Sequence, residues 1–181
     1  MLGDFCRGVD LALLPSGVRG AVELHFRVDA FTDAHPVVRE SKRRIEPPHR
    51  RYAGVLIDMF YDHFLARNWE QYSTESFPEF TARAYAALRA HEGILPERMR
   101  RAAGAMVADD WLGSYREVAG IEAALGRMAR RLTRQNNLAT GADALRCRYE
   151  ELEEDFHRFF PDLQRFAARE VQQPRGWGIT G

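Results

Sequence analysis

The stretch of sequence that decides the fold is VLIDMFYDHFL, residues 55–65. Placed on a helix, it is apolar nearly all round, and it lies in a longer helical segment predicted from about residue 51 to residue 71. A helix without a broad polar face belongs in the interior of a protein. The stretch therefore predicts a buried central helix, into which Asp58, Asp62 and His63 are set.

The rest of the chain also has the composition of helices, because Ala, Leu, Arg and Glu are abundant and β-branched residues are sparse. Helices are predicted at about residues 15–33, 37–45, 79–92, 95–110, 116–134 and 142–173, with a break in the last one at Pro161. The predicted fold class is all-α, a single-domain bundle of about seven or eight helices. It spans residues 1–173, and residues 174–181 are predicted to form a flexible tail.

The composition excludes several classes of protein. Lys+Arg and Asp+Glu both total 26, so the chain is formally neutral and is not expected to bind nucleic acid. The two cysteines, Cys6 and Cys147, have no metal-binding or redox spacing. Neither a signal peptide nor an apolar run long enough for a membrane is apparent, so we expect no membrane association and a cytoplasmic location.

Acidic and imidazole side chains share one face of the predicted helix at about residues 15–33. His25, Asp29 and Asp33 stand at i, i+4 and i+8. Carboxylates one turn apart repel unless a positive charge lies between them. Imidazole and carboxylate together suit Mn²⁺, Mg²⁺ or Fe²⁺. The alternative is a solvated polar face that carries an ordinary histidine.

Asp58 and Asp62 repeat this spacing in an apolar helix, where a buried carboxylate needs compensation. A metal ion or a catalytic role would explain why two carboxylates stand in this apolar helix. His63 lies about a quarter-turn from Asp62. The alternative is a buried aspartate–arginine pair, formed with Arg27 or Arg67.

A third acidic piece lies near the N-terminus, where Asp4 and Arg7 stand in the stretch GDFCRG at residues 3–8. The flanking glycines allow close approach of the backbone. Asp4 is a candidate metal ligand and Arg7 a candidate phosphate-binding residue. The alternative is that Asp4 caps a helix. Three acidic pieces in one small domain suggest a shared metal ion.

Basic clusters occupy residues 42–44, 50–51 and 127–134. Such clusters are usually solvated surface, but in a neutral protein they also suit the docking of an acidic partner.

Several motifs taken together resemble the acyl carrier protein phosphodiesterase family. They are Gly-Asp-Phe-x-Arg-Gly at 3–8, His-x-Arg-x-Asp-x-x-Thr-Asp at 25–33, Arg39-Glu40, Asp-x-x-x-Asp-His-Phe-Leu at 58–65, Trp69, and Phe156-x-x-Phe159-Phe160-Pro161. The resemblance covers about residues 1 to 170.

The resemblance implies an all-helical fold of the HD-domain type. It implies a metal-dependent hydrolase, with Mn²⁺ the first choice of cation, that removes 4′-phosphopantetheine from holo-acyl carrier protein in fatty acid biosynthesis and lipid metabolism. The acidic carrier protein would be the partner, and an arginine-rich rim at residues 42–51 and 127–134 would orient it.

The resemblance also implies which residues form the site. The leading catalytic or metal-binding residues are Asp4, His25, Asp29 and Asp62, followed by Asp33, Asp58 and His63, while Arg7 and Arg27 are the phosphate-binding candidates. Two departures accompany this transfer: the chain apparently lacks the family's usual N-terminal strip, and it contains no His-Asp dipeptide, so any HD-type metal site is altered.

Two other functions are compatible with the residues. One is a metal-dependent phosphohydrolase that acts on nucleotides or small phosphate esters, which substrate comparison would distinguish. The other is a non-catalytic helical protein that binds an acidic partner, for which we expect binding without turnover.

Overall fold

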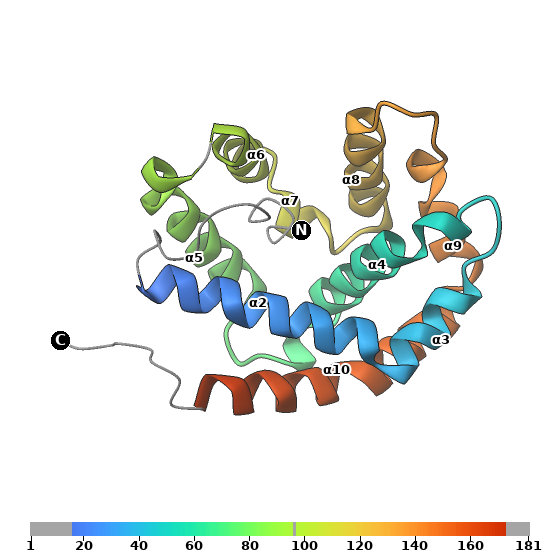
Figure 1. Cartoon of the computed structure of the whole chain (residues 1–181), viewed down its shortest axis with the longest axis horizontal. Coiled ribbons are helices and arrows are strands. Elements are labelled where there is room, and N and C mark those ends of the chain that lie inside the picture. The colour runs from blue at the N-terminus through green and yellow to red at the C-terminus, as the bar shows by residue number, and fades with distance from the viewer. Residues whose placement is uncertain (1–15, 96, 173–181) are drawn as a thin grey trace. The chain divides into compact units, whose positions relative to one another are not determined.

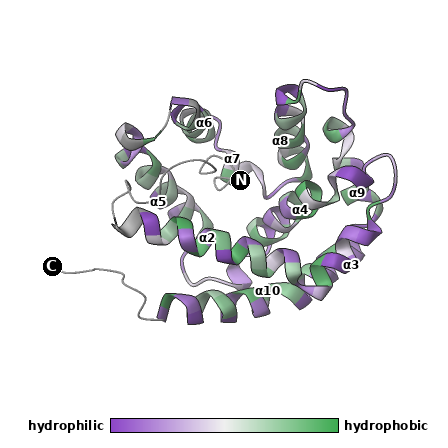
Figure 2. Cartoon of the chain, viewed as in Figure 1, coloured by the Kyte–Doolittle hydropathy of each residue, from purple (hydrophilic) through white to green (hydrophobic). Residues whose placement is uncertain are grey.

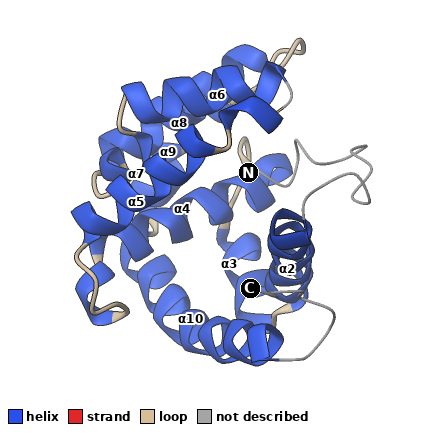
Figure 3. Cartoon of the chain, turned by 90° about the vertical axis from the view of Figure 1, so that its left-hand side faces the viewer, coloured by secondary structure: helices blue, strands red, loops and turns tan. Residues whose placement is uncertain are grey.

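The computed structural model describes residues 16–95 and 97–172, and these form nine α-helices and no strand (Figures 1 and 3). The prediction of an all-α protein is confirmed. Short 3₁₀ turns at 50–52, 69–71, 92–94 and 138–140 join some of the helices. The α-helices are α2 (Ser16–Ala34), α3 (Pro36–Arg44), α4 (Ala53–Arg67), α5 (Phe77–Ala90), α6 (Glu97–Ala108), α7 (Trp111–Ser114), α8 (Val118–Arg131), α9 (Ala142–Cys147) and α10 (Tyr149–Gln172).

The chain divides into two compact units. One is formed by residues 1–40 and 155–181, which we call the terminal unit, and the other by residues 41–154, the central unit. The boundaries fall inside α3 and α10, so both helices continue from one unit into the other. The predicted tail at 174–181 lies outside the described residues.

Helix α4 forms the core of the central unit. Leu56, Ile57, Phe60 and Phe64 are fully buried, and α4 packs against α8, whose Leu125 is also fully buried. Each such side chain contributes about 1.5–3 kcal/mol when it leaves water. The buried central helix predicted from residues 55–65 is therefore confirmed.

Helix α5 begins two residues earlier than the sequence analysis predicted. Ser76 caps it: the Ser76 hydroxyl accepts a hydrogen bond from the Glu79 backbone N–H, and the Glu79 carboxylate accepts one from the Ser76 backbone N–H. This reciprocal pair satisfies donors that the first turn of a helix leaves unpaired. Pro78 fits the first turn because its missing N–H is not needed there.

A polar network fixes the short helix α7. Asp110 has a φ of 43°, and its carboxylate accepts hydrogen bonds from the backbone N–H of Gly113 and from the hydroxyl of Tyr85. The Tyr85 hydroxyl in turn accepts a bond from the backbone N–H of Leu112 at 2.8 Å. A side chain at position 113 would collide with the Asp110 carboxylate, so glycine is required there. Tyr85 thereby ties α7 to α5.

The predicted break in the C-terminal helical segment is wrong in its position. The interruption lies at Arg148, between α9 and α10, whereas Pro161 stands inside α10. Proline removes one backbone hydrogen bond and crowds the carbonyl four residues earlier. Phe156 and Phe159, which precede Pro161 in α10, are buried. Their packing keeps the helix continuous despite this cost. Figure 2 shows the alternating hydrophilic and hydrophobic stripes of this helix.

Within the terminal unit, α2 packs against α10 through aromatic side chains. The ring of Phe31 stacks on that of Phe166, with 4.4 Å between centroids, and also contacts Phe159. The His35 imidazole meets the Phe159 ring edge-on and lies 3.2 Å from the carboxylate of Asp162. Such aromatic pairs contribute roughly 0.5–1.5 kcal/mol beyond the area they bury.

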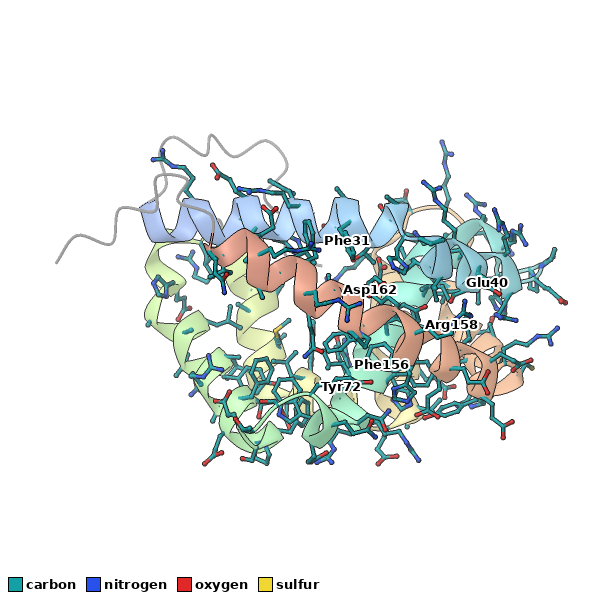
Figure 4. The ribbon with its side chains drawn as sticks, turned by 90° about the horizontal axis from the view of Figure 1, so that it is seen from below. Phe31, Glu40, Tyr72, Phe156, Arg158 and Asp162 are labelled. Atoms are coloured by element: carbon teal, nitrogen blue, oxygen red, sulfur yellow. The ribbon has the colours of Figure 1, made fainter. Side chains whose placement is uncertain are left out.

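A further ion pair holds α10 to the end of the terminal unit's α3 segment. The Arg158 guanidinium donates to Glu40 at 3.3 Å and to the buried carboxylate of Asp155 at 3.0 Å (Figure 4). Asp155 is 1% exposed, so its charge requires this partner. No helix in the described ranges is both long enough and apolar enough to cross a membrane.

Candidate active site

Two of the predicted site residues, Asp4 and Arg7, lie outside the described residues. The others are distributed over both units: His25, Asp29 and Asp33 lie on α2 of the terminal unit. Asp58, Asp62 and His63 lie on α4 of the central unit.

His25 and Asp29 form a side-chain pair on α2. The Nε2 atom of His25 lies 3.4 Å from a carboxylate oxygen of Asp29. That distance suits an ion pair, but the atoms are not aligned for a hydrogen bond, and Nε2 makes none. Asp33, one turn further along, is exposed. The predicted shared face on α2 is therefore present and offers an imidazole nitrogen beside carboxylate oxygens.

Arg27 is held by another side chain. Its guanidinium donates to the carboxylate of Glu170 on α10 at 2.5 Å, and a second carboxylate, that of Glu23, lies 3.7 Å away. A phosphate that bound Arg27 would compete with Glu170. The phosphate-binding role of Arg27 stays a prediction.

The two aspartates of α4 are not buried among its apolar side chains, contrary to the sequence analysis. Asp58 and Asp62 are exposed, together with Val55, which is 41% exposed. These three positions stand at i, i+3 and i+7 and form one strip along the helix. The helix is buried on its other sides, so the two carboxylates occupy the one face that the described residues leave uncovered.

Asp62 has the more unusual environment of the two. Desolvation raises its pKa from 3.8 to about 7, and repulsion by the Asp58 carboxylate adds to the rise. Its side chain nevertheless keeps accessible surface. Because an exposed group loses less solvation than a buried one, the pKa of Asp62 is raised above its usual value but by less than full burial would raise it. A carboxyl group that is accessible and has a raised pKa can exchange a proton near neutral pH.

His63 is fully buried, and both of its ring nitrogens are hydrogen-bonded. Nδ1 lies 2.8 Å from the backbone carbonyl of Tyr115, and Nε2 lies 2.9 Å from the hydroxyl of Tyr149. A carbonyl can only accept, so Nδ1 carries the proton and Nε2 accepts from the Tyr149 hydroxyl. Burial lowers the pKa of His63 below 6.5 and keeps the ring neutral, while the bond to Tyr115 opposes this shift.

The sequence analysis missed Tyr115 as a possible site residue. Tyr115 is 3% exposed, yet its hydroxyl has no hydrogen-bond partner among the described residues. Burial raises the pKa of this hydroxyl to about 12, and the Asp62 carboxylate adds to the effect. The Arg127 guanidinium also acts on this hydroxyl and lowers its pKa.

Arg127 was assigned by the sequence analysis only to a basic surface cluster. Its guanidinium carbon lies 4.2 Å from the centre of the Trp111 ring, and its Nη2 atom is buried without a hydrogen-bond partner. Its spacing in the sequence could have indicated that Arg127 lies on the buried face of α8. Gly120, Ala124 and Arg127 stand at i, i+4 and i+7, and Gly120 and Ala124 are buried.

The described residues do not by themselves form a metal site. In residues 16–95 and 97–172 no group of three His, Cys, Asp or Glu side chains is placed to hold one ion. The pairs His25 with Asp29, and Asp58 with Asp62, each offer donors of the right chemistry from one helix. A third ligand would have to come from elsewhere, so we derive no chemical step through a metal.

Comparison with known proteins identifies the family. The family model described as acyl carrier protein phosphodiesterase matches residues 1–163. A protein of that name from Serratia proteamaculans (strain 568) is 33% identical over 92% of this chain and 87% of its own length. Those from Enterobacter sp. (strain 638) and Escherichia coli O6:H1 are 34% and 33% identical over 90% and 94% of this chain, and 85% and 89% of their own lengths.

No solved structure matches this chain, so the HD-domain likeness stays a prediction. The family model and the relatives together cover most of the sequence, including every predicted site residue. The resemblance found in the sequence motifs is confirmed, and the chain belongs to the acyl carrier protein phosphodiesterase family.

Proposed function

We propose that this chain hydrolyses the phosphodiester that joins 4′-phosphopantetheine to holo-acyl carrier protein and returns the carrier protein to its apo form. The observation that carries the proposal is the family match over residues 1–163. Relatives that bear the name acyl carrier protein phosphodiesterase align over nine-tenths of the chain. We include a cytoplasmic location and a link to fatty acid biosynthesis in the proposal.

Hydrolysis of a phosphodiester requires a water nucleophile, a group that accepts its proton and positive charge that stabilises the phosphoryl oxygens. Asp62 suits the proton transfer, because it is accessible and its pKa is raised towards neutrality. His63 suits it less well. Protonation of its Nε2 would place a positive charge in the core and would require the Tyr149 hydroxyl to accept a hydrogen bond instead of donating one. We therefore assign His63 a positioning role.

We propose that turnover also requires a divalent cation, with Mn²⁺ the first choice and Mg²⁺ or Fe²⁺ the alternatives. The support is chemical: Asp29 with His25, and Asp62 with Asp58, combine imidazole and carboxylate donors one turn apart. A bound cation would lower the pKa of its water and neutralise charge on the phosphate. Asp4 and Asp33 are the further ligand candidates.

The protein substrate would be oriented by basic side chains of the central unit. Arg43, Arg50 and Arg51 are exposed near the end of α3, as are Arg130 and Arg131 at the end of α8. Because acyl carrier protein is acidic, long-range attraction would raise the association rate, most strongly at low salt. Arg127 does not belong to this rim, since its guanidinium packs on Trp111.

Mass spectrometry of holo-acyl carrier protein after incubation with the chain tests the proposal. We expect loss of the phosphopantetheine mass with Mn²⁺ and no loss with EDTA. Asp29→Asn and Asp62→Asn are each expected to lower kcat/KM at least a hundredfold, on the scale of a lost acid–base group. Asp143→Asn is the matched control, because Asp143 is exposed on α9 and its carboxylate pairs with the neighbouring Arg146.

Three outcomes would contradict the proposal in different ways. Turnover of nucleotides but not of holo-carrier protein would assign another phosphohydrolase activity. Binding of the carrier protein without turnover would assign a non-catalytic partner protein. Charge reversal at Arg130 and Arg131 that left kcat/KM unchanged at low salt would remove the proposed rim while leaving the reaction itself intact.

A further inference from the structure

The loop that follows α8 exposes an apolar side chain among arginines. Leu132 is 46% exposed and is one of four large apolar side chains that are exposed in the described ranges. A single exposed leucine needs no explanation in itself, because scattered apolar side chains are normal on a protein surface. Leu132 is distinguished by its neighbours: every charged residue within five positions of it is an arginine. Arg130, Arg131 and Arg134 among them are exposed.

These three exposed arginines have no acidic partner in the part of the chain that the structure describes. Other arginines of the central unit do, since Arg146 and Arg148 each pair with two carboxylates. An arginine without a carboxylate beside it keeps its full charge for a partner in solution. A group of such arginines attracts an acidic surface and repels a basic one.

Asn136 holds the loop of residues 132–137 in one conformation. Its Nδ2 donates to the backbone carbonyls of Ala129 at 3.2 Å and Arg134 at 3.0 Å, and its Oδ1 accepts a bond from the backbone N–H of Leu138 at 3.2 Å. Leu138 is buried, so it anchors the end of the loop in the core. The loop therefore needs little ordering when a partner binds, which lowers the entropic cost of association.

Both halves of the arginine-rich rim lie at the same end of the central unit (Figure 1). The 3₁₀ turn that follows the loop, residues 138–140, packs on α8. The hydroxyl of Thr140 in this turn lies 3.0 Å from Nε2 of His49. His49 directly precedes Arg50 and Arg51, which lead into α4. The hydrogen bond between His49 and Thr140 therefore joins the segment before α4 to the segment after α8.

The distance from this end of α4 to Asp62 suits a protein substrate. Helix α4 begins at Ala53, nine residues before Asp62, which corresponds to about 14 Å along the helix. A folded domain of about 100 residues has a radius of gyration of about 13 Å. A carrier domain whose phosphodiester lies at Asp62 is therefore wide enough to contact the rim as well.

We infer that the 132–137 loop is a docking surface for the acidic carrier protein, in which Leu132 contacts an apolar side chain of the partner and the arginines beside it pair with carboxylates. The apolar contact contributes affinity through burial, while the charges contribute orientation and association rate. Asn136 is a positioning residue, because it holds the loop without touching the partner. The inference rests on the proposed function for the identity of the partner.

Docking and turnover are measured separately with the full chain. Calorimetric titration with apo-acyl carrier protein, which has no phosphopantetheine to lose, reports docking alone. Steady-state kinetics with holo-acyl carrier protein reports kcat and KM. Both measurements are made at low and at high salt, because only the contribution of the charges is screened.

Each variant removes one part of the docking surface. Leu132→Gln should weaken binding about fivefold at both salt concentrations. Arg134→Glu should weaken it about tenfold at low salt and much less at high salt. Asn136→Ala frees the loop, so it should weaken binding and leave the salt dependence as in the wild type. In all three variants KM should rise while kcat stays unchanged.

Val171→Gln and Arg89→Glu are the matched controls, because both residues are exposed and lie on other helices, α10 and α5. Both should bind the carrier protein as the wild type does, and thermal melting by circular dichroism checks that every variant is folded. Wild-type binding by both Leu132→Gln and Arg134→Glu would overturn the inference and leave the proposed reaction intact. Binding of the carrier protein without release of phosphopantetheine would refute the reaction but keep the docking surface, and no binding by the wild type would overturn the docking surface.

Discussion

His63 provides the sharpest test of how the central unit is held together, because each of its ring nitrogens contacts a different group. The buried Tyr115 carbonyl receives the Nδ1 proton, and the half-buried Tyr149 hydroxyl donates to Nε2. His63→Asn keeps a donor at the position of Nδ1, whereas His63→Gln places its amide at the position of Nε2. The two variants therefore remove different hydrogen bonds with similar chemistry.

The magnitudes follow from what each variant leaves unpaired. His63→Gln deprives a buried carbonyl of its donor, which costs about 1–3 kcal/mol. His63→Asn removes the acceptor of the hydroxyl of Tyr149, a half-buried residue, so the expected loss is about 0.5–1.5 kcal/mol. In a chain of this size each kcal/mol corresponds to roughly 2–4 °C in Tm. Urea denaturation followed by circular dichroism at pH 8 measures both variants, with Tyr149→Phe as the control for the second bond.

The same residue predicts a pH dependence. Burial lowers the pKa of folded His63 below 6.5, so the unfolded chain binds a proton here more readily than the folded chain does. The free energy of unfolding then rises with pH in this range. The contribution is fully present above pH 6.5 and is lost as the pH falls below it. Wild type should lose more stability than either variant between pH 8 and pH 5.5.

The reasoning would be refuted by a reversed order, with His63→Asn less stable than His63→Gln at pH 8. Equal loss of stability in acid by wild type and both variants would show that His63 does not titrate as its burial requires. Either result would also weaken the assignment of a fixed, neutral imidazole behind Tyr115.

Two further substitutions test the packing of single residues. Gly120→Ala would drive its Cβ into the backbone carbonyl of Ser114, so we expect a loss of about 1–3 kcal/mol in urea denaturation. Gly126→Ala, which meets only the flexible end of Arg130 at 3.6 Å, should instead gain about 0.5–1 kcal/mol. Pro161→Ala restores a backbone donor inside α10 and should raise Tm; a fall in Tm would show that the proline is needed where it stands.

The sequence predicted the helices well because their signals are local. The apolar run at 55–65 predicted α4 because the signal acts within a few residues of where it stands. The error at Pro161 has the opposite cause. Packing of Phe156 and Phe159 overrides a local preference, and no window of sequence around the proline contains that information.

The candidate site was harder to predict because its parts come from separate helices. The spacing of Asp58 and Asp62 correctly placed both on one stripe of α4, but the apolar run gave no sign that this stripe is exposed. Tyr115 and Arg127 were missed because an aromatic residue and an arginine each have an ordinary role in isolation. Only the fold shows that the Tyr115 hydroxyl and the Nη2 atom of Arg127 are buried without a hydrogen bond among the described residues.

The order of Asp62 and His63 on α4 has a functional consequence. Neighbouring residues on a helix point about 100° apart, and here one step separates an accessible carboxyl group from a fully buried imidazole. The imidazole is fixed in one tautomer by two hydrogen bonds, so it holds structure and does not exchange protons readily. The carboxyl group, whose pKa is raised by desolvation and by its neighbour Asp58, is the one able to do so. Since the imidazole also bonds the backbone carbonyl of Tyr115, a single turn of α4 both supplies the proposed proton acceptor and fixes the segment that follows α7.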